Sequence, residues 1–243
     1  MPKPEYVQAL RQDSAAIEVA GARDLHAAVP ACPGWQLGDL VDHVGQIHRW
    51  VTAMVEANAS ERYDRKSQPQ SPRKDSEKLA WFRQGAARLV EALETAGEET
   101  PVWNWSQLPH LSAFWHRRMA HETSIHRWDA ESAAAIAAPI AAELATDGID
   151  ELLEVFLPRL LATLPTAADL GGALAVRTTD TDRVWVIDCG RLADPANAGE
   201  AGAAVSADAS TVLLFLYNRV GIERLEVNGD ITIAANGRDR MRW

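Results

Sequence analysis

Apolar residues between positions 37 and 55 constrain the fold of this chain more than any other feature. They recur at every third or fourth position, which places them on one face of a single amphipathic helix. A helix with one apolar face must bury that face against other elements. The segment therefore predicts one member of a helical bundle. The face consists of Leu37, Leu40, Val41, Val44, Ile47, Val51, Met54 and Val55.

Three further segments in the first half of the chain show the same helical rhythm. They run from about Pro4 to Leu25, from Asp75 or Ser76 to a stop at Gly97, and from about Leu111 to Ala135. Together with the helix over 37–55, they predict a four-helix bundle.

Two irregular stretches interrupt these predicted helices. Residues 29–35 contain two prolines and a glycine, which breaks the chain before the second helix. Ser60–Lys78 is polar and charged and carries two prolines, so we expect a long loop there. Such loops inside a compact domain are usually lids or disordered segments, and disorder is the favoured interpretation.

The pattern changes after about residue 140. One more helix fits Asp147–Leu164, and after it the apolar runs shorten to strand lengths. The sequence therefore predicts an all-α domain over residues 1–140 and an α+β domain over residues 141–243. The expected elements of the second domain are strands at Leu174–Thr178, Val184–Cys189, Ala203–Ser206 and Leu225–Asn228, with a short helix at Ala209–Tyr217.

Charge and cysteine content narrow the classes of function. Lys and Arg number 24 against 34 Asp and Glu, a formal net charge of −10, which suits neither nucleic-acid nor anionic-membrane binding. Cys32 and Cys189 are too far apart for a CxxC motif or a zinc knuckle, and we expect neither to act as a nucleophile. The sequence shows no apolar leader and no stretch long enough to span a bilayer, which predicts a cytoplasmic protein.

The predicted helix over 111–135 carries an unusual set of polar residues. His121 and His126 are five positions apart, about 140° around a helix, so they cannot share a metal ion. Glu122 and His126 are four apart and lie on one face. Taken alone, this pattern fits an exposed face with an i,i+4 Glu–His pair. The same face carries Trp115, Arg118, Met119 and Asp129.

His43 lies at the edge of the apolar face of the second helix, in DLVDHVGQIHRW, while His48 projects elsewhere. On its own, His43 fits a half-buried side chain on the rim of the bundle. If the second and fourth helices are neighbours, His43 converges with Glu122 and His126. Two imidazoles and a carboxylate form a three-ligand site for Zn²⁺ or a similar ion and leave a fourth position open. Asp129 lies one turn past His126 and is placed to orient the His126 ring.

Four segments carry a more specific pattern. They are CPGWQLGDLVDHVG (Cys32–Gly45), FWHRRMAHETSIHRWDAE (Phe114–Glu131), DGIDELLEVFLPRL (Asp147–Leu160) and AVSADASTVLLFLYNRVGIERLEVNGD (Ala204–Asp230). These segments resemble the mycothiol-dependent maleylpyruvate isomerase family. The resemblance covers most of the chain and implies a DinB-like four-helix bundle followed by a small α+β domain similar to sterol carrier protein 2.

The resemblance also implies a set of functional residues. A divalent metal, usually zinc, would be held by His43 of the second helix and by Glu122 and His126 of the fourth. A catalytic arginine follows the short apolar helix of the second domain and corresponds to Arg219 in LLFLYNRVG, where it would bind a substrate carboxylate. The two residues before Arg219 are Tyr and Asn, where the family commonly has Trp and Gly.

The activity implied by this resemblance is addition of a metal-activated mycothiol thiolate to a small electrophile, in a maleylpyruvate-type cis–trans isomerisation or an S-transfer. The expected partners are that electrophile and the low-molecular-weight thiol, and the chain is expected to be a monomer or homodimer. Twenty arginines against four lysines agree with an actinobacterial source, where mycothiol replaces glutathione. Two alternatives stay open: a non-catalytic small-molecule binder with a structural metal, and a thiol-independent zinc hydrolase.

Overall fold

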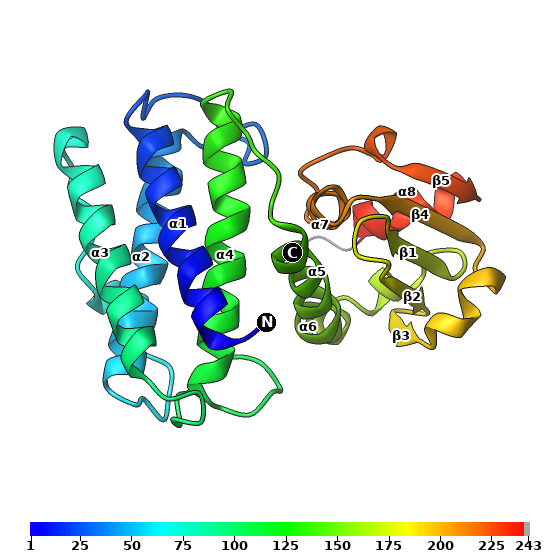
Figure 1. Ribbon diagram of the computed structural model, residues 1–243, viewed down its shortest axis with the longest axis horizontal. Coiled ribbons are helices and arrows are strands. Elements are labelled where there is room, and N and C mark those ends of the chain that lie inside the picture. Colours follow the sequence, from blue (N-terminus) through cyan, green and yellow to red (C-terminus); the bar gives the residue numbers. More distant parts are fainter. Residues whose placement is uncertain (241–243) are drawn as a thin grey trace. The chain divides into compact units, whose positions relative to one another are not determined.

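Four long helices form the first of two units in the computed structural model, which describes residues 1–240 (Figure 1). This unit spans Met1–Ala138, and the second spans Pro139–Trp243. The predicted four-helix bundle is therefore confirmed. Its helices are α1 (Lys3–Gly21), α2 (Leu37–Glu56), α3 (Asp75–Thr95) and α4 (Ser112–Ala133).

Contacts between these helices define an arrangement in which α2 and α4 are neighbours. The most extensive contacts join α1 to α4 and α2 to α3, followed by α1 to α3 and α2 to α4. Helices α1 and α2 are therefore diagonal to each other, although they are consecutive in sequence. The apolar face predicted for α2 lies in the core of the bundle, and its eight residues are all buried. This packing lets residues on α2 and α4 share one site.

The first helix ends earlier than the sequence predicted. It stops at Gly21 instead of continuing to about Leu25. The reason is a local turn in which the Asp24 side chain accepts a hydrogen bond of 2.8 Å from the backbone N–H of His26. Such side-chain to backbone hydrogen bonds compete with helical ones and end a helix.

The segment between α2 and α3 is an irregular loop with one 3₁₀ turn, η1 (Arg65–Ser67), as expected from its composition. The expectation that it is disordered is wrong, because two side chains of α2 hold it. Trp50 donates from Nε1 to the carbonyl oxygen of Tyr63 at 2.8 Å. Gln46 donates from Nε2 to the carbonyl oxygen of Arg65 at 3.0 Å. The loop is thus attached to the helix that carries His43.

The second unit combines helices with a five-stranded mixed sheet, which confirms the predicted α+β class. Its helical elements are α5 (Ala142–Glu151), a π-helical turn η2 (Leu152–Phe156), α6 (Leu157–Thr163), η3 (Pro165–Ala168), η4 (Pro195–Glu200), α7 (Ala209–Leu216), η5 (Ile222–Arg224) and α8 (Ile231–Arg240). Its strands are β1 (Leu174–Thr178), β2 (Val184–Asp188), β3 (Arg191–Ala193), β4 (Ala203–Ala207) and β5 (Glu226–Gly229).

The strand order of this sheet is β3-β2-β1-β4-β5. Strands β1 and β4 pair in parallel, and the other neighbours pair antiparallel. Helix α7 contacts α5 most extensively and also contacts β1 and β4, and its apolar residues are buried. Strand β3 and helix α8 have no counterpart in the sequence prediction. The helix expected at Asp147–Leu164 begins at Ala142 and is divided by the π-helical turn.

No helix within residues 1–240 combines the length and the apolar character needed to cross a bilayer.

Candidate metal site

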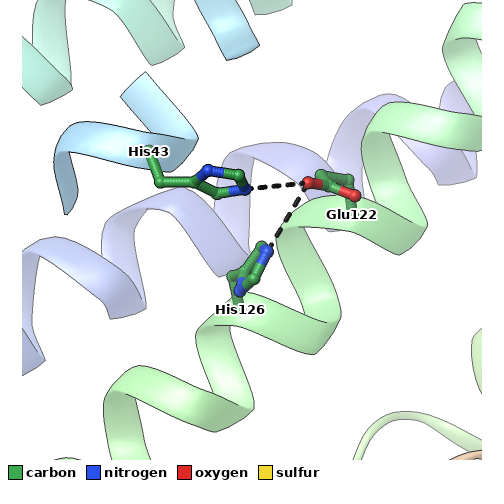
Figure 2. Close-up of side chains that lie close together, drawn as sticks. All are labelled: His43, Glu122 and His126. Atoms are coloured by element: carbon green, nitrogen blue, oxygen red, sulfur yellow. Dashed lines mark ion pairs between the residues drawn. The ribbon is translucent and has the colours of Figure 1, made fainter. Parts of the chain in front are cut away.

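Three side chains from α2 and α4 meet at one point of the bundle (Figure 2). His43 comes from α2, and Glu122 and His126 come from successive turns of α4. Oxygen Oε1 of Glu122 lies 3.6 Å from Nε2 of His43 and 3.5 Å from Nε2 of His126. The packing of α2 on α4 thus brings together the three residues singled out in the sequence.

The spacing of these atoms fits a small divalent ion. One potential ligand atom from each residue lies within 4.8 Å of the other two. Ligands about 2.1 Å from a shared tetrahedral centre lie about 3.4 Å apart, close to both Glu122–histidine distances. Two imidazoles with one carboxylate are a donor set that suits zinc and similar transition metals. The residues present therefore fit the group that the sequence predicted.

The second oxygen of Glu122 has a separate partner. Arg118, one turn earlier on α4, donates from Nη2 to Oε2 at 2.6 Å, and its side chain is only 5% exposed. Burial alone would raise the pKa of Glu122, but the Arg118 charge and hydrogen bonds from His126 and His43 hold that pKa well below its usual value. Arg118 therefore keeps the carboxylate ionised and leaves Oε1 facing the two histidines.

Asp129 fixes the orientation of His126, as the sequence predicted. Its side chain is completely buried, and its Oδ2 lies 3.1 Å from Nδ1 of His126. Burial alone would lower the pKa of His126, but hydrogen bonds to Asp129 and Glu122 raise it to about 9. In the metal-free protein both ring nitrogens thus face carboxylates. A carboxylate on the outer nitrogen of a histidine is the usual support for a metal ligand.

The turn before α2 positions the ring of His43. Gly34 adopts a φ of 85°, a conformation that favours glycine, in the turn that precedes Trp35. The ring of Trp35 then packs against that of His43, with centroids 5.1 Å apart. His43 is the most exposed of the three candidate ligands, with 33% of its side chain accessible. This contact explains why the sequence CPGW precedes the histidine at this distance.

The polar face of α4 is buried, so its interpretation as an exposed face is wrong. Glu122 and His126 keep 20% and 12% of their side chains accessible. His121 points away from them, and its ring packs edge-on against Tyr6 of α1. The other residues of this face are buried as well, so the whole face packs against the rest of the bundle. They are Trp115, Arg118, Met119 and Asp129.

A second contact between α2 and α4 lies next to the candidate ligands and was missed from the sequence. Nε2 of His48 lies 3.0 Å from Oγ1 of Thr123, and both residues are fully buried. Burial lowers the pKa of His48 to about 3. A neutral histidine therefore ties the two helices at the level of Glu122. Helical spacing alone could not show this contact, because it depends on the rotation of one helix against the other.

The other residues considered in the sequence analysis are not among the three candidate ligands. Arg219 follows α7 in the second unit, where its Nη1 donates to the carbonyl oxygen of Tyr217 at 2.9 Å. Its role in binding a substrate stays a prediction. Cys32 lies at the edge of the bundle core, with Sγ 4.0 Å from Oδ2 of Asp129. Cys189 is exposed between β2 and β3.

Comparisons with known proteins agree with this architecture. Residues 7–131 match the family model described as mycothiol maleylpyruvate isomerase N-terminal domain, and residues 143–235 match the one described as MDMPI C-terminal domain. The crystal structure of the mycothiol-dependent maleylpyruvate isomerase is similar, with a TM-score of 0.59 and 15% identity over 94% of this chain and 93% of that chain. The crystal structure of a mutant of that enzyme has a TM-score of 0.56 and 14% identity, over the same fractions of the two chains. No curated protein matches the chain.

Proposed function

The chain belongs to the mycothiol maleylpyruvate isomerase family, and from this premise we propose that it is a metal-dependent enzyme that uses mycothiol as its thiol cofactor or co-substrate. Its reaction would add the thiol to a small electrophile, either in a cis–trans isomerisation of the maleylpyruvate type or in an S-transfer. The observation that carries the proposal is the convergence of His43, Glu122 and His126 in the family's N-terminal domain.

The side chains of the site have distinct roles in this proposal. His43, Glu122 and His126 would hold the metal. A bound zinc ion supplies a Lewis acid that favours the thiolate form of a coordinated thiol. Asp129 orients the His126 ring through Nδ1, and Arg118 keeps the Glu122 carboxylate ionised through Oε2. The exposed edge of His43 leaves a side from which small molecules can approach.

Arg219 has the chemistry to bind a carboxylate of the electrophile, since a guanidinium can donate two parallel hydrogen bonds to it. This role rests on the family resemblance and on its place directly after α7. It is part of the proposal.

A reaction screen tests the proposed function directly. Zinc-loaded protein is incubated with maleylpyruvate and with common electrophiles, with and without mycothiol. We expect turnover only when both metal and mycothiol are present. Turnover with metal but no thiol would indicate a zinc hydrolase instead. A metal that raises the melting temperature without supporting any turnover would indicate a structural ion in a small-molecule binder.

We expect metal uptake to depend steeply on pH. In the metal-free protein the pKa of His126 is about 9, so at neutral pH the ring must lose a proton before Nε2 can bind a metal. Apparent affinity should rise about tenfold per pH unit between about pH 7 and pH 9, with about one proton released per ion. Competition titrations with a chromophoric chelator measure the affinity, and calorimetry in two buffers counts the protons.

The variant Asp129→Asn provides the control for this pH dependence. It removes a carboxylate that raises the pKa of His126, so the affinity should level off at lower pH than in the wild type. The maximum affinity should also be about 10 to 100 times weaker, as is usual when an outer carboxylate is lost. An affinity that does not change over this pH range would contradict the proposed role of His126.

A further inference from the structure

Arg65 is held in a fixed turn over the helix that carries His43. It begins the 3₁₀ turn η1, whose first N–H groups are capped by Asp64: the Asp64 side chain accepts from the backbone N–H of Lys66 at 3.0 Å. The carbonyl oxygen of Arg65 is bound by Gln46 of α2, as described above. The guanidinium lies over the ring of Trp50, 5.1 Å from its centroid. Both backbone and side chain are thus placed by α2.

This position is next to the candidate metal site. Trp50 lies seven residues after His43, so both are on the same face of α2. Trp50 packs edge-on against Trp115, which in turn lies seven residues before Glu122 on α4. Burial lowers the pKa of Arg65 and the negative charge of Glu122 raises it, so the two groups are close enough to interact. Because Gln46 and Trp50, about one and two turns after His43 on α2, both contact Arg65, this residue lies within about two helical turns of His43.

The guanidinium of Arg65 is only partly satisfied by the protein. Its Nε is buried and has no hydrogen-bond partner among the residues that the structure describes. A buried donor without a partner is costly, of the order of 1–3 kcal/mol. The charge of Arg62 also repels that of Arg65. A half-buried cation with an unused donor and a second cation nearby is suited to receive an anion.

We propose that Arg65 forms a subsite that binds a carboxylate of the electrophilic substrate near His43 and Glu122. The planar guanidinium can donate two hydrogen bonds to a carboxylate, and the Trp50 ring below it keeps the plane in place. The subsite lies within the first unit and involves no residue of the second. It deepens the proposed function, since it rests on the electrophile reaching the metal site and assigns the binding of one of its carboxylates to Arg65.

Maleate, a small cis-dicarboxylate that needs no thiol to bind, is the probe for this subsite. Calorimetric titrations compare the wild-type full chain with Arg65→Gln, Arg65→Lys and Lys66→Gln. Lys66 is the matched control, because it is the next residue of the same turn, carries the same charge and is exposed. Each protein is titrated both with and without zinc, and its metal content is measured separately.

We expect Arg65→Gln to weaken maleate binding about tenfold or more, the loss typical of a charge-assisted pair. Arg65→Lys should give an intermediate loss, because it keeps the charge but not the fork of donors. Lys66→Gln should stay within about twofold of the wild type, since an exposed charge contributes little. Maleate binding by Arg65→Gln as strong as that of Lys66→Gln would overturn the subsite, as would a wild-type protein that binds no maleate.

These outcomes are separable from the fate of the metal proposal. A wild-type chain that takes up no metal but binds maleate through Arg65 would refute the proposed metal-dependent function and support the anion subsite. If the wild-type chain takes up metal at His43, Glu122 and His126 but Arg65→Gln binds maleate as well as the wild type does, the subsite is refuted and the metal site is supported. Melting temperatures of the variants show whether a loss of maleate binding comes from unfolding. If Arg65→Gln is unfolded, the maleate affinity of Arg65→Lys tests the subsite instead.

Discussion

Replacing Glu122 by glutamine is expected to lower metal affinity by more than about 100-fold, because loss of a direct ligand must exceed the 10- to 100-fold loss typical of an outer partner. The same change removes the charge that pairs with Arg118, whose side chain is 5% exposed. Removing one partner of a buried ion pair costs about 3 kcal/mol or more. Metal-free Glu122→Gln should therefore also unfold at lower denaturant concentration. Metal competition titrations and denaturant unfolding measure the two effects.

Helix α4 contains its own control for this experiment. Arg127 and Glu131 form a second i,i+4 pair, with Nη1 and Oε2 2.7 Å apart and side chains 7% and 12% exposed. Glu131→Gln should cost comparable stability but leave metal affinity unchanged. The double variant Arg118→Met/Glu122→Gln should recover part of the stability, since an apolar side chain no longer needs the buried carboxylate, and should still bind metal weakly. Wild-type affinity in Glu122→Gln would remove Glu122 from the site.

The sequence predicted the bundle and the pairing of two candidate ligands on α4 because both depend on short-range periodicity. The α2 segment repeats apolar residues at helical spacing, and its burial follows from that pattern. Glu122 and His126 share a face because they are four residues apart on one helix. His43 was singled out from its place on the second helix, and the family resemblance implied the same residue, but its distance from α4 depends on how two helices pack. Only the structure shows that Oε1 of Glu122 lies 3.6 Å from this histidine.

Features that depend on tertiary packing were missed. Strand β3 is three residues long and forms by pairing with β2, so no alternating pattern announces it. Helix α8 contains Gly237, which lowers helix propensity, and its buried residues pack on the sheet. Arg65 lies in a polar loop whose composition suggested disorder. Its place against α2 is set by hydrogen bonds from Trp50 and Gln46, which no local spacing encodes.

Acid is expected to loosen the bundle through His48, the residue that ties α2 to α4. Its pKa is about 3 in the folded protein because burial disfavours the charged ring, against about 6.5 in an unfolded chain. The unfolded state therefore binds the additional proton as pH falls below about 6.5, and stability is lost from there down to about pH 3. The full difference between these two pKa values corresponds to about 5 kcal/mol at about 1.4 kcal/mol per unit. Stability above about pH 6.5 is unaffected by this group.

Two variants isolate this effect in metal-free protein. His48→Gln removes the titrating ring, so its unfolding free energy should fall less steeply than that of the wild type between about pH 6.5 and pH 3. Thr123→Val removes the hydrogen-bond partner at 3.0 Å but keeps the ring, so it should lose about 1 kcal/mol at every pH and retain the steep fall. Urea unfolding at a series of pH values gives these free energies. Parallel curves for wild type and His48→Gln would show that the ring accepts a proton inside the folded bundle. In that case α2 and α4 would be held at the metal site by the surrounding apolar contacts and not by a neutral histidine.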